Sequence, residues 1–106
     1  MNPLDYFRES GSHVIEKDWG WANYFINDKE CYIEIVYIDK EHRRKRKAFE
    51  LGEEITRAAK EMGCEYLTTT IATNRDGVER SMSLLVAFGF KYAKADQKAL
   101  WFIKEI

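Results

Sequence analysis

The residues of this sequence best suited to chemistry are five consecutive basic side chains, Arg43–Lys47, and one carboxylate, Glu34. A dense group of Arg and Lys binds phosphate through charge and hydrogen bonds. Glu34 lies within the apolar stretch "CYIEIVYI". A carboxylate buried among apolar side chains has a raised pKa, which suits it to accept a proton near neutrality. An ion pair between Glu34 and a Lys or Arg of another strand is the competing interpretation, and the sequence does not choose between them.

The basic run has three competing interpretations: a nucleic-acid or targeting patch, a solvated helix start, or a loop that holds a phosphate-bearing cofactor. The net charge is −1; setting these five residues aside leaves 12 of the 17 basic residues against 18 acidic ones. A protein that grips nucleic acid spreads basic side chains over a face, whereas the rest of this chain would repel a long polyanion. The distribution favours a small, highly charged anion.

Apolar periodicity predicts a mixed α/β fold in one domain, residues 1–106. Residues 3–10 could form a helical turn. Runs rich in β-branched and aromatic residues predict strands at 13–19, 21–28 and 30–38. The third strand is apolar on both faces apart from Glu34, which is the pattern of a strand buried in the middle of a sheet.

The second half of the chain is predicted to alternate helices and strands. Ala48, Leu51, Ile55, Ala58 or Ala59, and Met62 recur at steps of three and four, which predicts a helix capped by Gly63. The elements after it are a strand at 65–73, a helix at 78–88 and a hairpin around Asp96–Gln97. A right-handed crossover should bring Glu30–Ile38 and Tyr66–Thr73 into parallel register.

The basic run therefore lies at the turn from a central strand into the N-terminus of the main helix. Helix N-termini expose unpaired N–H groups and a partial positive charge, so they bind phosphate readily, and neighbouring Arg or Lys side chains strengthen the effect. This position favours a cofactor phosphate as the ligand of Arg43–Lys47.

The segment "IVYIDKEHRRKRKAFELGEEITRAAKEMGC" resembles a region of the GNAT superfamily of acyl-CoA-dependent N-acetyltransferases. The family pattern is a strand, a short acidic turn and then R/Q-x-x-G-x-G/A at the start of a helix. Arg43 stands at the R/Q position and Ala48 at the final G/A. Further on, "YLTTTIATN" resembles the family's next strand with its terminal Asn, and "SMSLLVAFGF" resembles the helix that ends in Gly-Phe.

The resemblance implies a GNAT-like, mostly antiparallel sheet, flanked by helices, with one central parallel strand pair that splays apart around acetyl-CoA. The pyrophosphate would lie on the backbone N–H groups of Arg43–Ala48, and backbone around Val36–Ile38 would pair with the pantetheine arm. Asn74 would lie near the cofactor at the end of the neighbouring strand. The implied cofactor-binding residues are Val36, Ile38, Arg43, Arg44, Lys45, Arg46, Lys47, Ala48 and Asn74.

The resemblance further implies an acetyl-CoA-dependent N-acetyltransferase in which a primary amine of a small molecule or a peptide attacks directly. Glu34 is the candidate catalytic base, because some amine-acetylating members carry a Glu at this place on the strand. Tyr37, Tyr92 and a bound water are all candidates for the acid. Trp19 and Trp21 either line an acceptor pocket or belong to the core. The acidic remainder of the chain favours cationic amines.

Two departures from the family pattern keep an alternative open. Arg46 stands where the family has its first Gly, and Leu85 stands where many members carry a Tyr proposed to protonate the departing thiolate. The alternative is a catalytically inactive GNAT-fold binding or structural module, similar to some phage proteins. A nucleic-acid-binding protein is the weakest of the three hypotheses, and a homodimer is compatible with the first two.

Cysteine usage and apolar run lengths argue against several other classes. Cys31 and Cys64 lie far apart with no nearby His, so no metal site is expected and both thiols should be free and buried. The N-terminus lacks an apolar signal core, and no apolar run approaches the roughly 20 residues of a membrane span. The expectation is a cytoplasmic protein that does not contact membranes.

Overall fold

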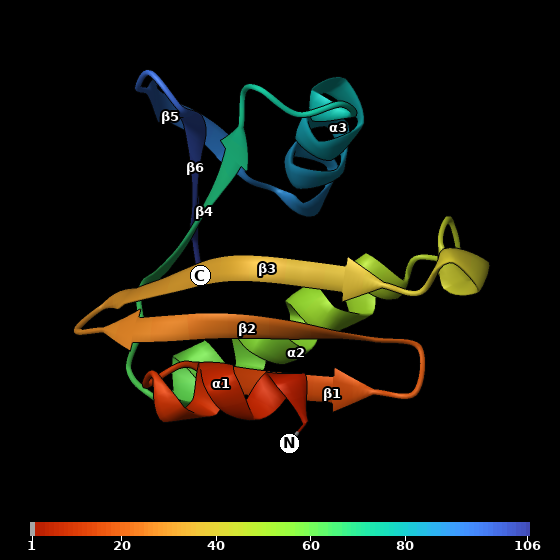
Figure 1. Cartoon of the computed structure of the whole chain (residues 1–106). Helices are drawn as coiled ribbons and strands as arrows, with labels where there is room; N and C mark the ends of the chain where they lie inside the picture. Colours follow the sequence, from red (N-terminus) through yellow and green to blue (C-terminus); the bar gives the residue numbers. More distant parts are fainter. Residues whose placement is uncertain (1) are drawn as a thin grey trace.

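The computed structural model describes residues 2–106 and has a six-stranded sheet with helices on both sides (Figure 1). In chain order the elements are α1 (Pro3–Glu9), β1 (His13–Lys17), β2 (Gly20–Asn27), β3 (Glu30–Ile38), the short 3-10 helix η1 (Lys40–His42), α2 (Lys47–Glu61), β4 (Tyr66–Ala72), α3 (Val78–Phe88), β5 (Lys91–Ala95) and β6 (Ala99–Glu105).

The predicted order of strands and helices is confirmed. The helical turn expected at the N-terminus is helix α1, because Asn2 caps it by accepting a hydrogen bond from the Leu4 N–H at 2.9 Å and Pro3 fits its first turn. The hairpin β5–β6 is closed by Asp96, whose carboxylate accepts hydrogen bonds from the N–H groups of Lys98 and Ala99, each at 2.9 Å. Local signals of this kind explain why the sequence pattern was sufficient to predict these elements.

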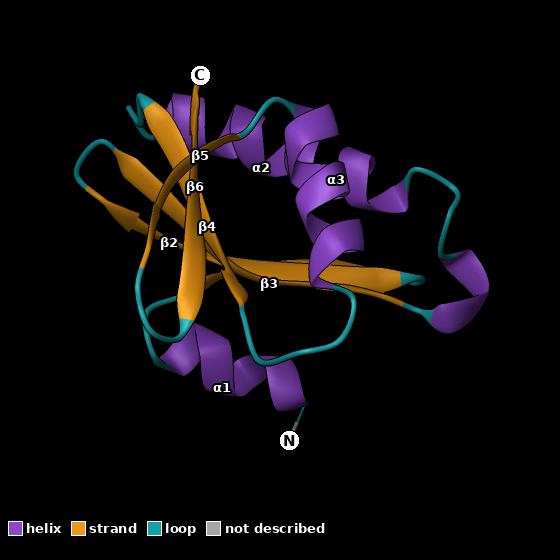
Figure 2. Ribbon diagram, turned by 90° about the horizontal axis from the view of Figure 1, so that it is seen from above, coloured by secondary structure: helices purple, strands orange, loops and turns teal. Residues whose placement is uncertain are grey.

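The sheet has the strand order β1-β2-β3-β4-β6-β5, and β3–β4 is its parallel pair. All other neighbouring strands are antiparallel. Helices α2 and α3 lie on one face, called the α2 face below, and α1 lies on the other, called the α1 face (Figure 2). The mixed α/β, mostly antiparallel architecture predicted from the sequence is confirmed.

The core forms between α2 and the sheet. Leu51, Ile55 and Ala59 follow one another at helical spacing and are fully buried. They belong to one buried cluster with sheet residues that include Leu67 and Phe102. Burial of each Leu or Ile side chain contributes about 1.5–3 kcal/mol to the free energy of unfolding. This packing fixes α2, and with it the helix N-terminus that follows the basic run.

Helix α3 is attached to α2 and β6 through Phe88. A Cβ atom on Gly52 of α2 would lie 2.7 Å from the Phe88 Cζ atom, so this glycine permits the close approach of the ring. From β6, the Lys104 ammonium donates a hydrogen bond to the Phe88 carbonyl at 2.8 Å and lies 4.0 Å from the ring centroid. These contacts close the C-terminal end of α3.

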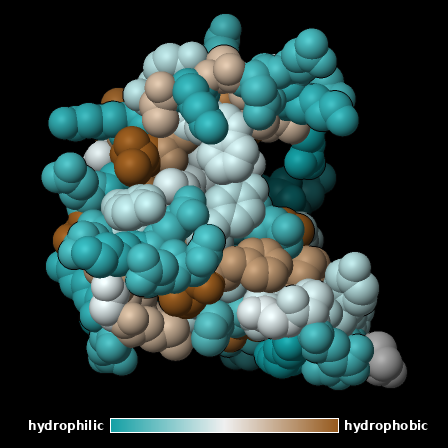
Figure 3. Space-filling view, turned by 90° about the vertical axis from the view of Figure 1, so that its left-hand side faces the viewer, coloured by the Kyte–Doolittle hydropathy of each residue, from teal (hydrophilic) through white to brown (hydrophobic). Residues whose placement is uncertain are grey.

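The surface at the β2–β3 turn is largely hydrophilic, with weakly polar and hydrophobic residues gathered in its middle (Figure 3). Within residues 2–106, no helix is long and apolar enough to cross a membrane.

Both Cys31 and Cys64 are buried free thiols, as predicted.

Candidate functional site

A β-bulge interrupts the pairing of β2 with β3. Tyr24 is paired with Ile33 and Asn23 with Ile35, so Glu34 is an extra residue on β3. The fully buried Asn23 side chain closes the gap, because its Oδ1 accepts a hydrogen bond from the Ile35 N–H at 3.1 Å. Its Nδ2 donates to Glu34 Oε1 at 2.8 Å and to Ser12 Oγ at 3.0 Å. The bulge is therefore held by a buried polar network.

The parallel strands β3 and β4 separate at this bulge. Their pairing runs from Glu30–Tyr66 to Ile33–Thr69, so the predicted parallel register is confirmed and covers only the first part of β3. Thr69 Oγ1 donates to the Ile33 carbonyl at 2.8 Å at the end of the paired part. Beyond it the ribbons diverge, as the family resemblance implied (Figure 1).

The carboxyl-terminal half of β3 is consequently exposed although the strand is internal to the sheet. The exposed fractions are 37% for Ile35, 42% for Val36 and 42% for Tyr37. On one side this segment pairs with β2, and on the side of β4 no strand within residues 2–106 pairs with it. The backbone edge of residues 35–38 is thus available for hydrogen bonds to a ligand.

The basic run connects this open edge to the N-terminus of α2. Arg43 is folded back, because its Nε donates to the Ile38 carbonyl at 2.9 Å. The side chains of Arg43–Arg46 are exposed, whereas Lys47 turns away, 3.4 Å from Glu50 and 4.9 Å from the Trp19 ring centroid. Four of the five predicted basic residues therefore face solvent at the helix start.

Arg46 is the N-cap residue of α2 and adopts the left-handed conformation, with φ 61° and ψ 20°. This is the conformation that Gly adopts without strain, and for Arg it costs about 1–2 kcal/mol. The guanidinium lies 4.7 Å from the Phe49 ring centroid, which recovers part of that cost. Among the residues that the structure describes, no side chain forms a hydrogen bond that caps the start of this helix. Its first N–H groups remain free to bind an anion.

Glu34 does not have the environment predicted for it. Its side chain is exposed, so the expectation of a buried carboxylate is wrong. The reason is that β4 diverges from β3 where Glu34 lies, which leaves this central strand open to solvent. The competing ion pair is not found either, since no ion pair among residues 2–106 includes Glu34. Its partner is the Asn23 amide.

The remaining sequence-predicted residues occupy three places. Val36, Ile38 and Arg43–Ala48 follow one another along the exposed end of β3 and into α2. Asn74 is exposed in the turn after β4, at the carboxyl end of the strand that diverges from β3. Leu85 packs against the hydrophobic core from α3. These predicted residues thus lie one after another along β3 and into α2, and Asn74 lies across the divergence.

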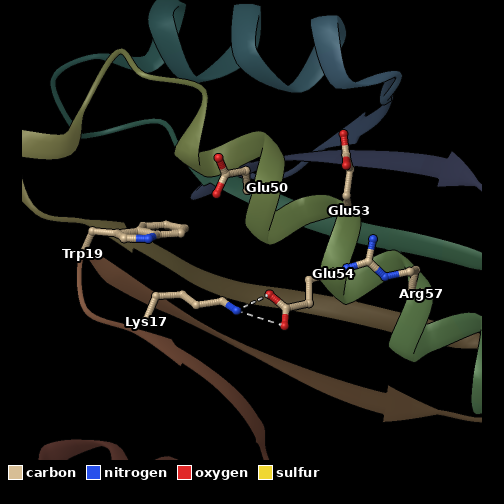
Figure 4. A pocket seen from close by; sticks show the side chains of 6 residues that line it. All are labelled: Lys17, Trp19, Glu50, Glu53, Glu54 and Arg57. Carbon is tan, nitrogen blue, oxygen red and sulfur yellow. Dashed lines mark hydrogen bonds and ion pairs between the residues drawn. The ribbon is translucent and has the colours of Figure 1, made fainter.

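Trp19 and Trp21 lie on opposite faces of the sheet. Trp19 lines a pocket of about 350 Å³ on the α2 face with Lys17, Glu50, Glu53, Glu54 and Arg57 (Figure 4). The Lys17 ammonium already pairs with Glu54 at 3.0 Å inside it. Trp21 instead contacts Tyr37, with ring centroids 6.1 Å apart. The two indoles therefore do not form one pocket.

Sequence reasoning missed Asn23, which holds the bulge. The signal available was a single amide in the apolar strand "WANYFI". A fully buried amide must have hydrogen-bond partners, so this residue marked a place where the backbone needed one. Within residues 2–106, no group of three or more His, Cys, Asp or Glu side chains could hold a metal ion.

The sequence matches a known protein family. The family model described as "Acetyltransferase (GNAT) family" matches residues 3–90 of the chain. No curated protein matches the sequence significantly.

Several solved structures share the fold. A GNAT family acetyltransferase from Elizabethkingia anophelis with acetyl-CoA bound has a TM-score of 0.80 at 8% identity, over 100% of this chain and 84% of that one. Nourseothricin acetyltransferase has a TM-score of 0.77 at 16% identity; the match covers 92% of this chain and 66% of that one, so this chain spans about two thirds of its length. An anti-CRISPR protein has a TM-score of 0.70 at 21% identity, and the match covers 86% of this chain and 97% of that one. At these identities the likeness is one of fold.

Proposed function

Because the chain belongs to the acetyltransferase (GNAT) family, we propose that it transfers an acetyl group from acetyl-CoA to a primary amine. The observation that carries the proposal is the divergence of β3 from β4, which opens one edge of β3 and leads it directly to the uncapped, basic N-terminus of α2. A ligand that combines an extended amide chain with a pyrophosphate fits this sequence of groups.

The donor would lie along β3 and end at α2. The open edge from Glu34 to Ile38 is roughly 13 Å long at the rise of a β-strand, and backbone around Val36 and Ile38 would pair with the pantetheine amides. The N–H groups of Arg43–Ala48 would hold the pyrophosphate. The exposed Arg44 and Arg46 guanidinium groups would bind the remaining phosphate. Asn74 would contact the donor from the other strand.

The chemistry needs one proton acceptor on the amine side. The amine nitrogen bonds to the acyl carbon while the carbon–sulfur bond breaks, and CoA leaves as a thiolate that takes a proton from water. Glu34 accepts the proton released by the amine, directly or through one water. Its exposure and its hydrogen bond from Asn23 support this role, because the carboxylate is reachable and held in place.

A second candidate is a binding module without catalysis. Leu85 favours it, since this residue packs into the core and supplies no proton donor at the place where many family members have a Tyr. The two candidates differ in one product: only the enzyme releases CoA thiol when an amine is added.

Calorimetric titration with acetyl-CoA and with dephospho-CoA tests the proposal, together with an assay of thiol release over a panel of amines. We expect acetyl-CoA to bind and dephospho-CoA to bind at least fivefold more weakly. The double variant Arg44→Glu/Arg46→Glu should lose most acetyl-CoA binding. Lys91→Glu/Lys98→Glu is the matched control, because it changes the net charge equally at exposed positions of the β5–β6 hairpin. Equal binding by both double variants would contradict the proposed phosphate site.

A further inference from the structure

Two hydroxyl groups bridge β3 and β4 at the point where these strands separate (Figure 1). The last paired residues are Ile33 and Thr69, and Tyr32 lies opposite Thr68. The Tyr32 hydroxyl nevertheless reaches Thr70, one residue beyond the last pair, and lies 3.0 Å from its Oγ1, within hydrogen-bond distance. The Tyr32 side chain therefore leans forward from the paired part of the sheet and crosses the start of the opening.

The bridge closes the end of the opening on the α1 face, and a second contact closes it on the α2 face. Cys31 and Ile33 are buried in the core cluster that includes α2. Side chains alternate along a strand, so Tyr32 between them faces the α1 side. On the α2 side, Thr69 Oγ1 donates to the Ile33 carbonyl at 2.8 Å, and both residues are buried. The opening between β3 and β4 thus ends at side chains on both faces.

Neighbouring strands hold the Tyr32 ring in this position. Its centroid lies 6.0 Å from that of Trp101, which is the cross-strand partner of Thr70 on β6. The Trp101 indole N–H donates in turn to Asp96 Oδ2 at 3.0 Å, and the Lys94 ammonium lies 5.2 Å from the centroid of the Trp101 ring. Because the Tyr32 ring is packed on one side and hydrogen-bonded at its tip, it has few alternative rotamers.

The proposed position of the donor directs its acyl group towards Tyr32. In that position the pantetheine arm follows the open edge of β3 from Ile38 towards Glu34, and the attacking amine gives its proton to Glu34. The acyl carbon must then lie near Glu34, which is the next residue after Ile33, the last paired residue of β3. Further carbons of an acyl chain would extend in the same direction, against the Tyr32 ring and the last strand pair.

We propose that Tyr32 sets the length of the acyl group that the protein accepts, and that its ring excludes donors with chains longer than acetyl. The inference rests on the proposed function, because it uses the donor position proposed there. A butyryl group is two methylene groups longer than an acetyl group, so it would have to displace the Tyr32 ring or separate the last strand pair. A closed site discriminates about 10- to 200-fold for one methylene group, and a clash with the longer chain is one way to achieve this.

Calorimetric titration with three donors tests the inference without an acceptor. The probes are acetyl-CoA, butyryl-CoA and free CoA, and free CoA reports binding of the part that the donors share. We expect the wild type to bind butyryl-CoA at least about tenfold more weakly than acetyl-CoA. Tyr32→Ala removes the ring, so it should bind the two acyl donors within threefold of each other and should bind free CoA within twofold of the wild type.

Matched variants separate the role of the Tyr32 ring from general effects on the sheet. Tyr66→Ala is the control, because Tyr66 is also partly exposed and lies on the same face, at the paired end of β4, so this variant should keep the wild-type preference. Tyr32→Leu still packs on Trp101 but cannot reach Thr70, so it should relax the preference even if Tyr32→Ala does not fold. Tyr32→Phe keeps the ring and should discriminate better than Tyr32→Leu.

Three results would overturn the inference: equal binding of acetyl-CoA and butyryl-CoA by the wild type, an equal loss of preference in Tyr66→Ala and Tyr32→Ala, or the wild-type preference retained by Tyr32→Leu. The assay of thiol release separates it from the proposed function. Equal rates of release from the two acyl donors would uphold the transferase and reject the role of Tyr32. A preference for acetyl-CoA that depends on Tyr32, without thiol release in the presence of any amine, would uphold that role and reject the activity. Failure of all three donors to bind would reject both.

Discussion

The Asn23 side chain takes the place of a strand backbone opposite Ile35. Its Oδ1 accepts the Ile35 N–H at 3.1 Å at the point where the bulge removes the regular partner. Asn23 is fully buried, and its amide nitrogen is also used, by Glu34 and Ser12. One side chain on β2 therefore holds the register of β3 and the position of the candidate base.

Replacement of Asn23 by Ala should destabilise the protein and distort the site. The change leaves the Ile35 N–H without its acceptor, which costs about 1–3 kcal/mol. We expect a lower free energy of unfolding by this amount in urea titrations, and weaker binding of acetyl-CoA in calorimetry. Ser12→Ala removes one contact of the same network but none to β3, so it should leave acetyl-CoA binding within twofold. Equal losses of binding in the two variants would contradict the role of Asn23 at the bulge.

The left-handed conformation of Arg46 predicts an unusual order of stability. Arg46→Gly removes a strain of about 1–2 kcal/mol and loses a cation–π contact of about 0.5–1 kcal/mol, so its free energy of unfolding should stay within about 1 kcal/mol of the wild-type value. Arg46→Ala keeps the strain and loses the contact, so it should be the least stable of the three. Thermal and urea unfolding measure the order. A more stable Ala variant than Gly variant would mean that residue 46 is not left-handed in solution.

Gly52 should not tolerate Ala, although Ala favours helices. In an open helix interior Gly→Ala gains up to about 1 kcal/mol. Here the new Cβ would lie 2.7 Å from the Phe88 Cζ atom, so α3 would have to shift, at a cost of about 1–3 kcal/mol. We expect Gly52→Ala to lower the free energy of unfolding, and to lower it less in a Phe88→Leu background. Additive effects in this double-mutant cycle would contradict the contact.

Burial of the Cys31 thiol predicts a loss of stability in alkali. Burial, reinforced by Cys64 and Glu30, raises its pKa from 9.0 to about 12. Between pH 9 and pH 12 the unfolded chain loses this proton while the folded chain keeps it, so the free energy of unfolding falls as pH rises, by at most about 1.4 kcal/mol per unit. Below pH 9 the contribution is constant.

The measurement is urea unfolding between pH 8 and pH 10.5 for the wild type and for Cys31→Ala, because other groups also titrate in this range. The difference between the two proteins should shrink as pH rises above 9. A difference that is independent of pH would show that the thiol titrates equally in the folded and unfolded chains.

The sequence predicted the elements of the fold well because their signals are local. The apolar spacing of Leu51, Ile55 and Ala59 is enough to identify α2 and its buried face. Gly89 marks the end of α3, where the backbone indeed adopts a φ of 109° that other residues rarely adopt. Such patterns depend on residues close in the chain, so no knowledge of tertiary contacts was needed.

The candidate site was predicted less well because it depends on pairing between distant residues. The pattern of β3 correctly indicated a central strand, but it could not show that β4 leaves this strand after Ile33. The buried environment predicted for Glu34 was therefore wrong. Likewise, nothing local indicates that Arg46 is left-handed, since Arg avoids that region. Only the family pattern, with Gly at this position, carried that information.

The opening between β3 and β4 is present without a ligand, which has a consequence for binding kinetics. The strands separate where an inserted residue is held by a buried amide, so they are already apart when a ligand arrives. A chain that adds to the free edge of β3 then breaks no hydrogen bonds between strands. Its association should follow simple second-order kinetics in stopped-flow experiments, without a plateau at high ligand concentration that would report a slow preceding step.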